Sequence, residues 1–131
     1  MFKGDKLFLI DFGMATSYTD DMTQTNNNDI IGSPKYISLN VHEGKNPTRI
    51  DDMISLGYIY LYMIGSWPPR ISEVDFPEIN ARIEKYKEAK RFDNIIKLGV
   101  QNKIHSYIDV FYRMKFNGVP DYKRIMDKFM D

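Results

Sequence analysis

The sequence predicts one mainly α-helical domain with a short β segment near its N-terminal end. Its 131 residues suit a single domain, and 43% of them are hydrophobic, which is enough for a packed core. The one strand-like pattern is the apolar run Lys6–Ile10, whereas about four later segments carry apolar residues at helical spacing around a strongly apolar central segment.

The first forty residues contain the predicted strand and a polar loop. The run Lys6–Ile10 is closed by Asp11-Phe12-Gly13, and a short apolar run followed by a turn is typical of a buried strand. The chain is polar from Thr16 to Asp29, so we expect a loop there. Gly32-Ser33-Pro34 then interrupts any regular element.

The strongest helix candidate runs from Asp52 to Gly65. Asp51 or Asp52 can supply its N-cap and the negative charge favoured at that end. The segment has no polar face, which is typical of a helix buried at the centre of a domain. Gly65 lies where a C-terminal cap is expected, and Trp67-Pro68-Pro69 prevents continuation.

Three further helical segments follow the central one. Pro77 to Arg91 is heavily charged, and Lys103 to Lys115 carries apolar residues at helical spacing. Pro120 can start the last helix, whose apolar stripe consists of Tyr122, Ile125, Met126 and Phe129.

Composition and charge exclude several classes of protein. The 18 Lys and Arg residues balance 18 Asp and Glu residues, which argues against a nucleic-acid or membrane-surface binder. With no Cys, the chain has no disulfides and no thiolate zinc site. The longest apolar run, Ile54 to Gly65, is too short for a bilayer span. We therefore expect an intracellular, cytoplasmic chain.

The motif Asp11-Phe12-Gly13 is the first candidate for chemistry. It follows a predicted strand and precedes a polar loop that ends in Gly32-Ser33-Pro34-Lys35-Tyr36, which is the order of elements in a protein kinase. A magnesium ion needs a carboxylate on a rigid element, because it tolerates little geometric error. The alternative is an Asp that begins an ordinary turn, with Phe12 in the core.

Five segments carry a resemblance to one kinase family. They match the family motifs Gly-Thr/Ser-x-x-Tyr, Ser-Ile-Asn, Asn-x-His-x-Gly, Ser-Arg-Arg-Asp-Asp-Leu-x-Ser-Leu-Gly-Tyr and Phe-x-x-x-Pro-Asp-Tyr. Here these are Gly32–Tyr36, Ser38-Leu39-Asn40, Asn40–Gly44, Thr48–Tyr58, and Phe116 with Pro120-Asp121-Tyr122. Their order and spacing make the chain resemble the casein-kinase-one group of Ser/Thr protein kinases, which includes the vaccinia-related kinases and their poxviral relatives.

The resemblance implies a truncated protein-kinase-like fold, namely the helical C-terminal lobe. It divides the domain 1–131 into the Asp-Phe-Gly strand and activation segment, 1–40, and a helical subdomain, 41–131. In the family the parent enzyme transfers the ATP γ-phosphate to protein Ser or Thr and uses Mg²⁺. The glycine-rich loop, the strand Lys and the catalytic-loop Asp of such kinases are not identifiable here. We therefore expect no catalytic residue and no stably bound Mg²⁺ or ATP in this chain.

The resemblance also implies a role for six residues. Asp11 corresponds to a metal ligand, and Gly13 is structural in the same turn. Ser33, Lys35 and Arg49 correspond to substrate-binding positions, with Arg49 part of an anion site that favours acidic substrates. The basic partners of Arg49 in this anion site are expected in the region of Lys87, Lys90 and Arg91. The alternative is that these side chains are simply solvated, as surface Lys and Arg usually are. Asp52 has a structural role, or merely caps its helix.

Three functions remain open at this level. The chain is part of a split or truncated kinase, a catalytically dead remnant (a pseudokinase) that binds a protein substrate or partner, or a helical binding domain with a coincidental Asp-Phe-Gly. Without the N-terminal lobe and the catalytic loop, apolar surface should be exposed beside the strand and the central helix. The missing N-terminal lobe is itself a candidate partner for that surface, and we expect no nucleic-acid and no membrane partner.

Overall fold

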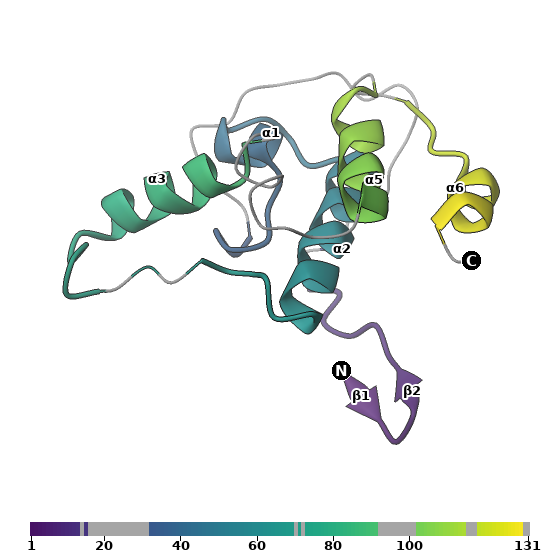
Figure 1. Ribbon diagram of the computed structural model, residues 1–131, viewed down its shortest axis with the longest axis horizontal. Coiled ribbons are helices and arrows are strands. Elements are labelled where there is room, and N and C mark those ends of the chain that lie inside the picture. The colour runs from purple at the N-terminus through teal and green to yellow at the C-terminus, as the bar shows by residue number, and fades with distance from the viewer. Residues whose placement is uncertain are drawn as a thin grey trace.

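The computed structural model describes residues 1–13, 15, 32–69, 71, 73–91, 102–114 and 118–129. This part of the chain is mainly helical, as predicted, with one short hairpin at its start (Figure 1). Its elements are β1 (Phe2–Lys3), β2 (Lys6–Leu7), α1 (Leu39–His42), α2 (Arg49–Met63), α3 (Ile79–Ala89), α5 (Asn102–Tyr112) and α6 (Tyr122–Phe129). The predicted loop from Thr16 to Asp29, and Phe116 of the last motif, lie outside the described residues. The predicted division after residue 40 falls inside α1 and stays a prediction.

The N-terminal hairpin is exposed, so the prediction of a buried strand over Lys6–Ile10 is wrong. β1 and β2 pair antiparallel with Phe2 opposite Leu7, and Gly4 turns the chain at a φ of 65°. The side chains after the turn face solvent, with Leu9 81% exposed. The hairpin extends away from the helices in Figure 1. An apolar run becomes a buried strand only when other elements cover it, and β1 is the only strand that pairs with β2 in the described part of the chain.

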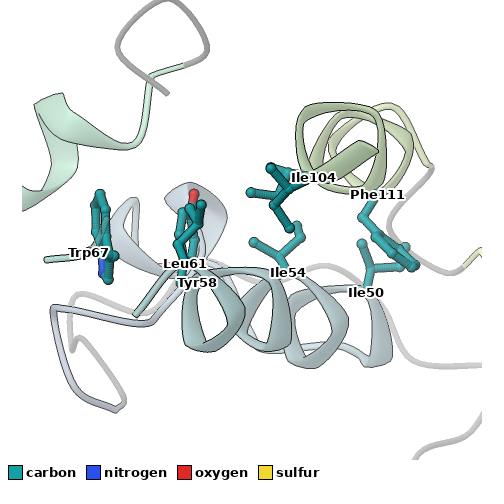
Figure 2. Close-up of a cluster of buried hydrophobic side chains, with 8 residues drawn as sticks. Ile50, Ile54, Tyr58, Leu61, Trp67, Ile104 and Phe111 are labelled. Carbon is teal, nitrogen blue, oxygen red and sulfur yellow. The ribbon is translucent and has the colours of Figure 1, made fainter. Parts of the chain in front are cut away.

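The core forms where α2 packs against α5. Figure 2 shows side chains of one face of α2 directed toward α5. The buried cluster consists of Ile50, Ile54, Tyr58 and Leu61 from α2, Trp67 after it, and Ile104, Ile108 and Phe111 from α5. The ring of Trp67 stacks on that of Tyr58 at 5.1 Å between centroids. Gly57 lets the two helices approach closely, because a Cβ there would lie 3.0 Å from Ile108.

The ends of α2 follow two standard capping patterns. Thr48, not Asp51 or Asp52, is the N-cap, and its hydroxyl accepts a hydrogen bond from the Ile50 N–H while Asp51 bonds back to the Thr48 N–H. At the other end Gly65 adopts a φ of 79°, and the N–H groups of Gly65 and Ser66 bond to carbonyls of the last turn. The predicted stop at Gly65 is confirmed.

Only one face of α2 is covered, so the prediction that it is buried all round is wrong. The other face exposes large apolar side chains: Leu56, Ile59, Tyr60, Tyr62, Met63 and, just after the helix, Ile64. Exposure of this apolar helix surface to water is unfavourable in free energy, and the cost is removed when another element covers the surface. This exposure confirms the expectation of uncovered apolar surface beside the central helix.

The outer helices flank the pair formed by α2 and α5. α3 lies to one side with no buried residue between Ile79 and Ala89, in keeping with its charged sequence, and α6 lies beside α5 (Figure 1). α6 begins at Tyr122, two residues after Pro120. Within the described residues, no helix combines the length and apolarity that a bilayer crossing requires.

Candidate functional site

Asp11 and Gly13 form an exposed turn directly after the hairpin. Asp11 has a φ of 63° and is the one non-glycine residue with positive φ in the described part of the chain. Asp tolerates this region better than most residues, because its short side chain can bond to nearby backbone. Here the Gly13 N–H lies 3.4 Å from the Asp11 Oδ1. The backbone therefore holds the carboxylate at a sharp turn, with its side chain open to solvent.

The described residues do not by themselves fit a magnesium site. Mg²⁺ requires an octahedral set of oxygen ligands, usually one or two carboxylates with phosphates and waters. No group of three or more His, Cys, Asp or Glu side chains gathers within the described ranges. The contact shown for the Asp11 carboxylate is the local one with the Gly13 N–H. Asp11 thus offers a single ligand, and no catalytic step follows from it alone.

The segment Ser33–Ile37 is held through its backbone. The Ser33 carbonyl accepts hydrogen bonds from the N–H groups of Tyr36 and Ile37, which closes a turn. The Lys35 carbonyl accepts a hydrogen bond from the Trp67 Nε1 at 2.7 Å. Because the carbonyl of Lys35 bonds to a buried side chain, the side chains of Ser33 and Lys35 are free to face solvent, and both residues are exposed. The segment is thus anchored through its backbone, with the Ser33 and Lys35 side chains on its outer side.

Lys90 makes the other bonds to this segment and corrects the expectation that it is solvated. Its side chain is 1% exposed, and its Nζ lies 2.6 Å from the Pro34 carbonyl and 2.7 Å from that of Ile37. A third contact, 2.7 Å, joins Nζ to the Nε2 of His42. Lys90 is therefore not available as a basic partner in a surface anion site with Arg49, whereas Arg91 is exposed and Lys87 half-buried.

Asp51 links the start of α1 to the start of α2. Its carboxylate accepts hydrogen bonds from the Ser38 Oγ at 2.5 Å, the Thr48 N–H at 2.8 Å and the Thr48 Oγ1 at 3.0 Å. Ser38 is also the N-cap of α1, since its Oγ accepts from the Val41 N–H. From the sequence, Asp51 is predicted only as a possible N-cap, whereas the spacing Thr48-x-x-Asp51 is that of a capping box, with Asp in place of the usual Glu or Gln.

Asp52, the expected structural Asp, lies at the surface of α2. Loss of part of its hydration raises the pKa of its carboxyl above the usual value, and the neighbouring charge of Asp51 adds to the rise. Arg49 is the first residue of the same helix and is half-buried. The structure thus brings Arg49 and Asp52 into one helical turn, where the interior carboxylate is that of Asp51.

Two tyrosines complete the connection between α1, α2 and α5. The hydroxyl of Tyr112 accepts a hydrogen bond from the Leu39 N–H at 3.1 Å and lies 2.8 Å from the hydroxyl of Tyr58. Burial raises the pKa of Tyr112 to about 12 and holds that of Tyr58 well above its usual value, so both hydroxyls stay protonated and can bridge. The start of α1 is therefore fixed from both α2 and α5.

Comparison with known proteins gives the chain its family. No family model matches the chain. Casein kinase I homolog 2 and casein kinase I homolog 1 of Saccharomyces cerevisiae are each 30% identical over 126 residues, which is 91% of this chain and 23% of each relative. Casein kinase I homolog 2 of Schizosaccharomyces pombe is 29% identical over 133 residues, 95% of this chain and 30% of the relative.

These relatives agree with the resemblance carried by the motifs. The chain spans 23% to 30% of the length of the curated relatives it matches. They are casein kinase I homologues of two yeasts, and they lend no support to the narrower vaccinia-related, viral or pseudokinase assignments. Over 91% to 95% of its length, the chain therefore corresponds to a portion of a casein kinase I-family kinase.

Proposed function

We propose that this chain is part of the C-terminal lobe of a casein-kinase-one-like Ser/Thr protein kinase, whose parent transfers the γ-phosphate of Mg²⁺-bound ATP to Ser or Thr in proteins. The observation that carries the proposal is the similarity to casein kinase I homologues over 91% or more of the chain. Similarity of that extent, together with Asp-Phe-Gly at the expected place, leaves little room for a coincidental motif.

The proposed substrate contacts lie on the Ser33–Ile37 segment and at the start of α2. Ser33 and Lys35 are exposed on a turn whose backbone carbonyls accept hydrogen bonds from the buried side chains of Trp67 and Lys90. An acceptor peptide could therefore lie across the exposed side of this turn. Arg49 would add positive charge that attracts an acidic peptide. The attraction would be weaker than that of the two adjacent arginines in the family motif, because the next residue here, Ile50, is apolar and buried. Asp11 would bind Mg²⁺ once ATP and the missing ligands complete its shell, with Gly13 allowing the turn.

The chain alone should be inactive. Phosphoryl transfer depends on positioned charges around the phosphates and on a base for the acceptor hydroxyl. The sequence offers Asp11 but no identifiable glycine-rich loop, strand Lys or catalytic-loop Asp.

A chimeric kinase tests the proposal directly. This chain would replace the matched portion of the Saccharomyces cerevisiae casein kinase I homolog 2, and transfer from labelled ATP to casein would be measured. We expect activity from the chimera, none from the chain alone, and at least a hundredfold loss for Asp11→Asn in the chimera, an order of magnitude typical of a lost catalytic group. The matched control Asp5→Asn changes an exposed Asp in the hairpin turn and should leave activity unchanged. An active Asp11→Asn chimera would rule out the metal-ligand role.

A second candidate function is a catalytically dead remnant that binds a protein partner through the exposed apolar face of α2. Leu56, Ile59 and Met63 lie together on that face, and the hairpin adds Leu9 and Phe12. An N-terminal lobe with its catalytic loop would cover such a surface in a kinase, and a different protein would do so in a remnant. An inactive chimera, with stop codons in the DNA upstream of Met1, would favour the remnant, whereas an in-frame catalytic loop upstream would favour the kinase.

A further inference from the structure

Lys90 lies at a junction of three segments that are distant in the sequence. It is the C-cap residue of α3, and its side chain passes into the interior to meet the Ser33–Ile37 segment and His42 of α1. The Nζ also lies 5.3 Å from the centre of the Tyr58 ring of α2. Its three polar neighbours are the Pro34 and Ile37 carbonyls, which can only accept a hydrogen bond, and the Nε2 of His42, which can accept or donate.

The hydrogen-bonding capacity of these groups allows two arrangements of protons. A charged Lys90 has three N–H groups, so it donates to both carbonyls and to the Nε2 of His42, which must then carry its proton on Nδ1. A neutral Lys90 has two N–H groups and one lone pair, so it donates to the carbonyls and accepts from an Nε2–H. A charged Lys90 facing a charged His42 at 2.7 Å is excluded by the lack of an acceptor and by repulsion.

The surroundings favour the arrangements with less positive charge. Burial lowers the pKa of Lys90 from 10.5 to about 7. Burial, followed by the charges of Lys90 and Lys87, lowers the pKa of His42 from 6.5 to about 4. Of the elements in contact, α2 offers the protonated Tyr58, α3 offers Lys87, and the segment offers carbonyls; no carboxylate in the described part of the chain contributes to either shift.

We propose that Lys90 and His42 form a proton-linked latch on the Ser33–Ile37 segment, which holds the segment most firmly when the pair carries no positive charge and releases it as the pair gains protons. Lys90 acts here as a positioning residue for the exposed side chains of Ser33 and Lys35. The proposal rests on donors, acceptors and burial, and it stands whether or not the parent transfers phosphate.

The latch has a definite pH dependence. A base whose pKa is lower in the closed state than in water binds a proton more readily once the segment opens. Opening therefore becomes easier as pH falls, by about tenfold for each pH unit in the range above the pKa of the closed latch. As Lys90 loses its proton, His42 should change from the Nδ1–H to the Nε2–H tautomer with the same midpoint.

Nitrogen-15 NMR of the full 131-residue chain tests this between pH 5 and 9. The Nζ of Lys90, both ring nitrogens of His42 and amide exchange at Tyr36 and Ile37 would be followed together. We expect one shared midpoint near neutral pH for the Lys90 titration and the His42 tautomer change. We also expect the opening constants of the two amides, corrected for intrinsic exchange, to fall about tenfold per pH unit above that midpoint.

Two Lys→Met variants on α3 and its cap separate the latch from general stability. Lys90→Met should abolish the pH dependence of the opening constants at Tyr36 and Ile37, whereas Lys85→Met, at an exposed position that pairs with Glu88, should keep it. If Lys90→Met does not fold, the wild-type titration decides alone. A His42 ring that keeps one tautomer through the titration of Lys90, or a segment whose opening follows the same pH profile as the amides of α2, would overturn the proposal.

Discussion

Replacement of Asp51 by Ala should destabilise the chain far more than the same change at its neighbour Asp52. Asp51 is 5% exposed and accepts hydrogen bonds from Ser38 and from two groups of Thr48. Loss of the N-terminal cap interaction costs about 1 kcal/mol. The loss of the carboxylate acceptor of the buried Ser38 hydroxyl adds about 2 kcal/mol. The sum is about 3 kcal/mol of unfolding free energy.

The control is built into the same turn of α2. Asp52 lies at the surface, and its raised pKa means that the folded state disfavours its charge, so Asp52→Ala should change stability by less than about 0.5 kcal/mol. Urea unfolding followed by circular dichroism at pH 7 measures both variants, with equal m-values required for the comparison. Equal losses for the two variants would refute the assignment of the interior role to Asp51.

Three further outcomes follow from the contacts described above. Tyr112→Phe leaves the Leu39 N–H without its acceptor and should cost about 1–2 kcal/mol in urea unfolding, more than Tyr58→Phe, which leaves that acceptor in place. The pKa of His42 is about 4 in the folded state and 6.5 in the unfolded state, so the unfolded state binds more protons between these pH values. The free energy of unfolding should therefore increase by about 3 kcal/mol from pH 4 to pH 6.5, and this stabilisation disappears again when the pH is lowered. His42→Gln should flatten the rise, and an unchanged slope in that variant would disprove the link. The chain alone should self-associate through the outer face of α2. The double variant Leu56→Lys with Ile59→Lys should shift its sedimentation toward monomer without lowering the midpoint of thermal unfolding. Unaltered sedimentation of this variant would count against association through that face.

The helices were predictable because their signals are local. The stop of α2 at Gly65 follows from a residue that adopts positive φ without strain, followed by Trp67-Pro68-Pro69. The stripe Ile104, Ile108 and Phe111 of α5 is likewise visible as spacing alone, and all three side chains are buried. The N-cap of α2 is Thr48, three or four residues before the predicted Asp51 or Asp52, because the acidic residue of a capping box stands at the third helical position and not at the cap.

Burial was predicted poorly, since it depends on elements far apart in the sequence. A run such as Lys6–Ile10 is compatible with a buried strand, but only the presence of covering layers decides it, and Leu9 is instead 81% exposed. Lys90 shows the opposite case. Its position at the end of a charged helix indicated a solvated side chain, and only the carbonyls of Pro34 and Ile37, more than fifty residues earlier, explain why it is buried.

The two halves of the candidate site differ in how they are supported, and this difference bears on how the parent kinase is assembled. The Ser33–Ile37 segment is tied by buried side chains of Lys90 and Trp67, so its shape is determined within this portion of the chain. The Asp11 turn follows an exposed hairpin and is held by local hydrogen bonds, from the Gly13 N–H to the Asp11 carboxylate and from the Ala15 N–H to the Phe12 carbonyl. Groups held by many buried contacts stay ordered in isolation, whereas exposed turns gain order from what packs on them. The proposed substrate-binding half should therefore be preformed in this chain, and the proposed metal-binding half should reach its working geometry only when other parts of a kinase cover the hairpin.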